Sequence, residues 1–211
     1  TIFIGQGEQH DELNAVAKGG TRMVVWGYPV QDKNYVVVGG DNTEGGYKAT
    51  RHVLDLGRRK VAFFGSTRNP ENAARYEGYT KALREFGIAA DPGRKVDVPF
   101  EMHRAREVII EVLESGVEFD AVVCISDVMA LATISTLQEV GVNVPKDVAV
   151  VGYDDISLAA YGNPPLTTIR QNIRHAGRIL VESVLGQIRG EHVPDTTLAS
   201  ELVVRKSSSS S

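Results

Sequence analysis

The stretch Val148-Ala-Val-Val-Gly-Tyr-Asp-Asp155 joins a near-continuous apolar run to two carboxylates at its end. An unbroken run of this kind is typical of a strand that is buried on both faces, as in a parallel sheet covered by helices. In such sheets, ligands lie beyond the carboxyl ends of the strands. The stretch therefore predicts an α/β fold with polar groups at one edge of a sheet.

Similar short apolar runs recur along the chain and alternate with helical patterns. The other predicted strands are Ile2–Ile4, Met23–Trp26, Tyr35–Val38, Val61–Phe64, Lys95–Val98, Ala121–Ile125 and Leu202–Val204. The predicted helices carry N-terminal capping residues or C-terminal glycines and span Asn42–Leu56, Asn72–Phe86, His103–Leu113, Asp127–Val140 and Asn172–Ile188. This alternation predicts doubly wound sheets.

Two features argue against a single sheet. Asp41 follows a strand and the pair Gly39-Gly40, and Pro164-Pro165-Leu-Thr-Thr-Ile169 is an extended segment. We interpret both as crossings between two lobes, which a chain of 211 residues can accommodate. The low-complexity run Ser207–Ser211 is predicted to be a flexible tail.

The charge balance bears on partners and location. With 23 Lys and Arg against 27 Asp and Glu, the chain lacks the basic excess of a DNA-gripping surface, so any DNA contact should lie outside it. The one cysteine, Cys124, lies in an apolar run and fits a reducing compartment. Neither a signal-peptide pattern nor a membrane-length apolar run is visible, so we expect a cytoplasmic protein without membrane contact.

A series of motifs between Asp41 and Arg205 resembles, in order and spacing, the effector-binding domain of LacI/GalR transcription repressors. The motifs are Asp41-Asn42, Leu56-Gly-Arg-Arg-Lys-Val-Ala-Phe-Phe-Gly65, Ala74-Arg-Tyr-Glu-Gly-Tyr79, Ile125-Ser-Asp-Val-Met-Ala130, Val144-Pro-Lys-Asp-Val-Ala-Val-Val-Gly-Tyr-Asp-Asp155, Pro164-Pro-Leu-Thr-Thr-Ile-Arg-Gln171 and Glu201-Leu-Val-Val-Arg205.

The resemblance implies a type I periplasmic-binding-protein-like fold: two doubly wound parallel-sheet lobes, joined by three crossings, with a ligand cleft between them. Residues 1–40 and 171–199 would form the N-terminal lobe, and residues 41–170 and 200–206 the C-terminal lobe. The family lobe begins with two further βα units, so about sixty residues and a DNA-binding head are expected ahead of Thr1.

Asp154 and Arg75 are the first candidate effector contacts that the resemblance implies. A carboxylate at a strand end can accept hydrogen bonds from two adjacent hydroxyls, which suits a sugar. Arg75 is expected in the first turn of its helix, where its planar donor fork would face the effector. The alternatives are a turn or capping role for Asp154 and a structural ion pair for Arg75. Asp155 is expected to point away and cap local backbone.

Ser126, Phe100 and Trp26 complete the predicted site. Ser126 stands where the family commonly has Asn, which leaves the hydrogen-bond pattern open, and Asp127 after it is expected to cap a helix. Phe100 is placed to lie against an apolar face of the effector. Trp26 ends a predicted strand, and stacking on the ligand and packing in the core remain equal alternatives.

The sequence offers no catalytic machinery. The five His residues lack metal-ligand spacing, and Gly5-Gln-Gly7 lacks the third glycine of a phosphate-binding loop. We therefore expect no enzyme activity, no metal and no cofactor.

The predicted function is effector sensing for a transcription repressor, with a small polar ligand, expected to be a sugar, that modulates DNA binding by a head outside this chain. The alternative is a periplasmic sugar-binding protein of a transporter. A homodimer is expected through the C-terminal lobe, by helix Asp127–Val140 and the loop Leu158–Tyr161, unless that helix is buried within its own lobe.

Overall fold

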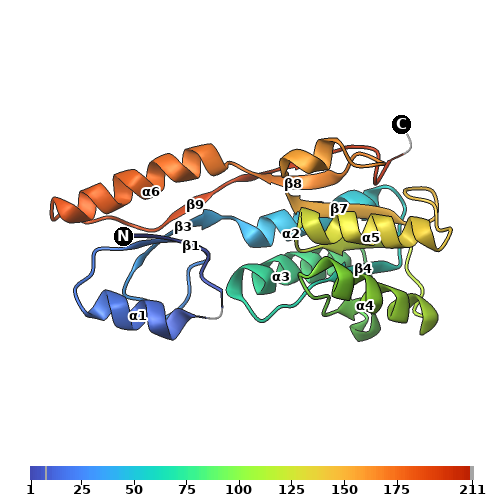
Figure 1. Ribbon diagram of the computed structural model, residues 1–211, viewed down its shortest axis with the longest axis horizontal. Coiled ribbons are helices and arrows are strands. Elements are labelled where there is room, and N and C mark those ends of the chain that lie inside the picture. The colour runs from blue at the N-terminus through green and yellow to red at the C-terminus, as the bar shows by residue number, and fades with distance from the viewer. Residues whose placement is uncertain (8, 210–211) are drawn as a thin grey trace.

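Two separate sheets lie toward the two ends of the long axis of the computed structural model, which describes residues 1–7 and 9–209 (Figure 1). In what we call the N-terminal lobe, four parallel strands stand in the order β1-β2-β3-β9. These strands are β1 (Ile2–Ile4), β2 (Val24–Trp26), β3 (Val36–Gly40) and β9 (Thr196–Leu198). The sequence did not predict β9.

The C-terminal lobe holds a larger sheet in the order β10-β8-β7-β6-β4-β5. Its strands are β4 (Val61–Phe64), β5 (Lys95–Val96), β6 (Ala121–Cys124), β7 (Ala149–Asp154), β8 (Thr167–Gln171) and β10 (Ser200–Val203). All pairs are parallel except β10 with β8. The predicted α/β class is confirmed, but the expectation of wholly parallel sheets is wrong at this pair. The reason is the route of the chain, because β8 leaves this lobe and β10 returns to it.

The chain passes between the two sheets three times, as Figure 1 shows: from β3 to α2, from β8 to α6 and from β9 to β10. The segment Pro164–Ile169 was expected to be a crossing itself. Instead, its second half forms strand β8, and the chain leaves the sheet only after Gln171.

Helices α1 (His10–Lys18) and α6 (Ile173–Ile188) cover opposite faces of the N-terminal sheet (Figure 1). On one face Leu13 of α1 packs with Val25 and its neighbours, and on the other Leu180 of α6 packs with Val24. Successive strand residues point to opposite faces, so Val24 and Val25 separate the two layers. Helix α1 was not predicted: it has only nine residues, and of these only Leu13 and Asn14 are buried.

The C-terminal sheet is covered by α2 (Asn42–Asp55), α3 (Pro70–Glu85), α4 (Met102–Glu114) and α5 (Asp127–Glu139). Strand β7 defines the two layers. A Cβ on Gly152 would lie 2.3 Å from Oδ1 of Asp127 in α5, whereas a Cβ on Gly45 in α2 would lie 2.3 Å from the hydroxyl of Tyr153. Because Gly152 and Tyr153 are successive strand residues, α5 and α2 lie on opposite faces.

Glycines allow α2 and α3 to pack closely. A Cβ on Gly46 would lie 2.0 Å from the carbonyl oxygen of Arg75, and one on Gly78 would lie 2.0 Å from that of Thr43. Larger side chains at either position would push the helices apart. This contact brings the N-terminal part of α2 against Arg75.

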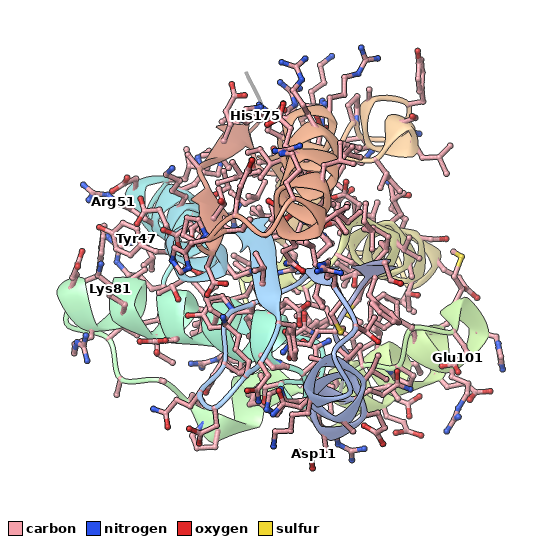
Figure 2. All side chains as sticks on the ribbon, turned by 90° about the vertical axis from the view of Figure 1, so that its left-hand side faces the viewer. Asp11, Tyr47, Arg51, Lys81, Glu101 and His175 are labelled. Carbon is pink, nitrogen blue, oxygen red and sulfur yellow. The ribbon has the colours of Figure 1, made fainter. Side chains whose placement is uncertain are left out.

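The outer edge of the same helix pair carries a cluster of charged and aromatic side chains. Figure 2 shows Tyr47, Arg51 and Lys81 together on this side of the molecule. The Lys81 ammonium lies 4.7 Å from the centre of the Tyr47 ring, and Arg51 donates to the Tyr47 hydroxyl at 2.8 Å. These exposed contacts add to the packing of α2 on α3.

The prediction of a flexible tail over Ser207–Ser211 is wrong for its first two residues. Ser207 and Ser208 are buried, and Ser207 joins two elements of the C-terminal lobe: its carbonyl accepts from Val150 N–H at 2.8 Å, and its N–H donates to the carbonyl of Pro165 at 2.9 Å. Small hydroxyl side chains suit this role, because they pair with backbone groups inside a crowded site. Residues 210–211 of the predicted tail lie outside the described residues.

Candidate ligand-binding cleft

A cleft of about 260 Å³ lies between the two lobes, where β2, β3 and β7 end and α2, α3 and α5 begin. The N-terminal lobe contributes Ile4, Gly5, Trp26, Gly27 and Gly40. The remaining lining residues are Asn42, Asn69, Glu71, Asn72, Arg75, Phe100, Ser126, Asp154 and Gln171. All five residues predicted from the sequence therefore line one cleft. Their contact with a ligand stays a prediction.

Arg75 crosses from α3 to the ends of two other elements. Its Nε donates to Asn42 Oδ1 at 2.8 Å, its Nη1 donates to the carbonyl of Ile125, and its guanidinium lies over the ring of Tyr153. Arg75 was expected in the first turn of its helix. Because α3 begins at Pro70, Arg75 lies in the second turn instead. Its hydrogen-bond partners, the Asn42 amide and the Ile125 carbonyl, are neutral. They do not form the structural ion pair that was the alternative.

Asp154 ends β7 with a φ of 110°, a left-handed conformation that L-residues other than glycine rarely adopt. Its Oδ1 accepts a hydrogen bond from Gln171 Nε2 at 2.7 Å, which links the end of β7 to the end of β8. Burial raises the pKa of Asp154, while the charge of Arg75 and the bond from Gln171 oppose that rise.

Asp155 does not line the cleft, and its carboxylate does not cap backbone as expected. Its carboxylate pairs with Arg170 and with Arg205, each at 2.6 Å. Burial alone would raise the pKa of Asp155, but hydrogen bonds from Arg205 and Arg170 outweigh it and lower that pKa. The prediction failed because both arginines lie on the neighbouring segments of the sheet, far away in sequence.

Ser126, not Asp127, caps helix α5. The Ser126 hydroxyl accepts from the Met129 N–H at 3.3 Å, while Asp127 is already the first helical residue. The buried Asp127 carboxylate instead accepts from the Ile156 N–H at 2.8 Å and from the hydroxyl of Thr168. Burial raises the pKa of Asp127 to about 6, although both of these bonds oppose the rise. Asp127 therefore holds together the segment that follows Asp154.

Trp26 and Phe100 supply the aromatic surface of the cleft. Trp26 is half-buried, lines the cleft and also packs against the core cluster of Val24, Val38 and Leu180, so it has both environments that the sequence left open. Phe100 lies in the loop before α4 and is 59% exposed. Exposed aromatic faces beside polar groups are well suited to stack on a ligand.

Sequence reasoning did not single out the amide-rich part of the cleft. Asn69 caps α3 by accepting from the Asn72 N–H at 2.8 Å, and the Asn72 side chain donates to the carbonyl of Ser66 at 3.0 Å. The pair Asn69-Pro70 is a helix-start signal that could have placed the beginning of α3 two residues earlier. That placement would have brought Asn69 and Glu71 into the predicted site.

Two further features, a membrane-spanning helix and a metal-binding cluster, are absent from the described residues. None of the helices there is long and apolar enough to cross a membrane. Over residues 1–7 and 9–209, no group of three or more His, Cys, Asp or Glu side chains is arranged to hold a metal ion.

Comparison with known proteins identifies the fold family. The sequence profile of the periplasmic binding protein-like domain family matches residues 50–208. The chain belongs to this family. The HTH-type transcriptional repressor PurR of Photobacterium profundum is 37% identical over 171 residues, which are 79% of this chain and 51% of that protein. PurR of Haemophilus influenzae is 34% identical over 188 residues, 86% of this chain and 55% of its own length. The chain thus spans about half the length of these relatives.

Solved structures place the family member among LacI-type regulators. The transcriptional regulator CelR in complex with cellobiose has a TM-score of 0.90 at 29% identity, over 98% of this chain and 64% of that one. A LacI family transcriptional regulator from Enterococcus faecium with bound ribose has a TM-score of 0.87 at 27% identity, over 98% of this chain and 79% of that one. The resemblance to LacI/GalR effector-binding domains is confirmed.

Proposed function

We propose that this family member is the effector-sensing domain of a LacI/GalR-type transcription repressor, that it acts in the cytoplasm and that it is not an enzyme. The observation that carries the proposal is the convergence of Trp26, Arg75, Phe100, Ser126 and Asp154 on one interlobe cleft. The relatives support it as well, because they are transcription regulators. For the same reason, the alternative of a transporter-associated sugar-binding protein is not favoured.

A sugar is the proposed class of effector. The cleft combines two aromatic side chains with carboxylate and amide groups, and this mixture can bind the apolar face and the hydroxyls of one sugar ring. Two of the similar structures hold cellobiose and ribose.

The proposed mechanism is a change in the opening of the cleft. The lobes are taken as residues 1–40 with 171–199 and residues 41–170 with 200–206, and three thin crossings join them. A ligand shifts such an equilibrium only by binding one arrangement more tightly than the other. A DNA-binding head in another part of the whole protein would read that shift.

We also propose that the whole protein forms a homodimer through the C-terminal lobe. The argument from the composition of helix α5 is weaker than the sequence indicated, because its own lobe buries Met129, Ile134 and Leu137. The proposal now depends on the short helix η2 (Ser157–Ala160) and its end, where Leu158 is 63% exposed and Tyr161 is 85% exposed. Exposed apolar side chains that lie close together are typical of protein interfaces.

The test is a thermal-shift screen of the full-length protein with neutral sugars, sugar phosphates, polyols and nucleobases. A true effector at a hundred times its Kd stabilises the folded state by about 2.7 kcal/mol. The same compound must then change the affinity of the protein for its operator DNA. Stabilisation without any change in DNA affinity would contradict the regulatory role.

A further inference from the structure

Glu71 is an acidic side chain of the cleft with an unused hydrogen-bond acceptor. It lies in the first turn of α3, and its Oε2 is buried with no partner among the described residues. A buried carboxylate oxygen without a donor is costly, so native proteins rarely leave one unpaired. Because Glu71 lines a ligand cleft, the missing donor is most simply supplied by the ligand.

The other oxygen of Glu71 faces the opposite lobe. A Cβ built on Gly27 of the N-terminal lobe would lie 3.5 Å from Glu71 Oε1, so this carboxylate reaches across the cleft from α3 to the loop after β2. Burial raises the pKa of Glu71, whereas the backbone N–H groups of Glu71 and Gln6 and the charge of Arg75 oppose that rise. The carboxylate therefore contacts both lobes.

The N-terminal side of this contact is held by two side-chain hydrogen bonds of Gln6. Gln6 is buried, its Nε2 donates to the Tyr35 hydroxyl at 2.9 Å, and its Oε1 accepts from the Tyr28 N–H at 3.1 Å. With both ends of its amide in use, Gln6 fixes the loop that meets Glu71. Movement of the lobes would change this contact before it changed the packing inside either lobe.

The charge of the cleft favours a neutral ligand. Its described lining holds two carboxylates, Glu71 and Asp154, and one cation, Arg75. Hydrogen bonds within the protein already use Nε and Nη1 of Arg75. A phosphate or carboxylate on the ligand would thus meet two acidic groups and a single cation, of which Nε and one N–H of Nη1 are already in use.

We infer that Glu71 is a specificity-determining residue that accepts a hydrogen bond from a hydroxyl of a neutral sugar, discriminates against phosphorylated sugars and links ligand binding to the contact between the lobes. This inference rests on the proposed function, since it names the class of ligand for the same cleft. It adds a residue that none of the predicted contacts includes.

The experiment uses Trp26, the one tryptophan of this chain, as a reporter inside the cleft. The full-length protein is titrated with cellobiose, ribose, glucose, glucose 6-phosphate, ribose 5-phosphate and inorganic phosphate while tryptophan fluorescence is followed. Any tryptophan outside this chain is first replaced by phenylalanine. Calorimetric titration of the unmodified protein gives the same affinities independently.

Glu71→Gln removes the charge and keeps the shape, and Glu77→Gln, an exposed position of the same helix, is the matched control. We expect the wild type to prefer a neutral sugar to its phosphate. Glu71→Gln should weaken binding of that sugar about 10- to 100-fold. It should also reduce the ratio between the affinities for the neutral sugar and for its phosphate. Glu77→Gln should change neither. Glu71→Asp, which keeps the charge but shortens the reach, should retain discrimination against the phosphate and lose affinity.

The outcomes separate the inference from the proposed function. Wild-type affinity and selectivity in a folded Glu71→Gln variant overturn the inference and leave the sugar-sensing function standing. A preference of the wild type for sugar phosphates also overturns it. If no sugar or sugar phosphate binds to the wild type, the proposed sugar-sensing function and the inference both fail. If Glu71→Gln does not fold, Glu71→Asp tests the inference instead. Unchanged sugar affinity in Glu71→Asp would contradict the inference, because its shorter side chain should lose the contact across the cleft.

Discussion

The guanidinium of Arg75 lies 3.7 Å from the centre of the Tyr153 ring, directly beside the strand end that carries Asp154. Tyr153 is buried, so the cation rests on a fixed aromatic face and not on a mobile surface ring. A desolvated cation over an aromatic ring is worth about 2 kcal/mol. Stability and the proposed ligand binding are therefore linked at this position.

Arg75→Ala is expected to lose the effector response and also to destabilise the fold. The structure shows two acceptors, on Asn42 and Ile125, that depend on Arg75. Losing their donors should cost about 1–3 kcal/mol for each buried group. Urea unfolding measures the loss, and Arg84→Ala, an exposed position of the same helix, is the control. Equal unfolding free energies for the two variants would contradict this role.

Asp154→Gly and Asp154→Ala are expected to differ in stability but not in function. Both remove the carboxylate, so neither should respond to effector. Only glycine adopts a φ of 110° without strain, so Asp154→Gly should be the more stable variant by about 1 kcal/mol or more. Thermal unfolding with and without effector checks both parts. A normal effector titration by either variant would remove Asp154 from the site.

Asp127 should make stability depend on pH between about 4 and 6. Its folded-state pKa is about 6 against an ordinary 3.8, so the folded state binds the proton more tightly. This contribution is present below pH 4, is lost as the pH rises through 6, and amounts to about 3 kcal/mol. In Asp127→Asn, the change in unfolding free energy between pH 4 and pH 7 should be smaller by that amount. Asp11→Asn, at an exposed position, should show the same pH dependence of stability as the wild type. Urea unfolding at pH 4, 5, 6 and 7 measures the difference.

The strand ends were predictable because they depend on local pattern. The apolar run before Asp154 and the glycine-terminated helices could be read directly, and the five predicted site residues lie in one cleft. Long-range partners could not be read in this way. The pairing of Asp155 with Arg205, the burial of Ser207 and the approach of Glu71 to Gly27 each depend on segments that only the folded chain brings together. Helix α1 has only nine residues and buries only Leu13 and Asn14, so few residues mark it in the sequence.

If the proposed dimer forms through the C-terminal lobe, only substitutions on the surface of that lobe should disrupt it. Leu158 and Tyr161 are exposed at η2, so replacing them should have little effect on the stability of a single subunit. The double variant Leu158→Asp with Tyr161→Asp should therefore be monomeric at micromolar concentration in light scattering. Its effector affinity should change little, because neither residue lines the cleft. Ile188→Asp, at an exposed apolar position of α6 in the other lobe, should remain dimeric. A full-length wild type that is monomeric at this concentration would contradict the dimer, and a double variant that still dimerises would place the interface elsewhere.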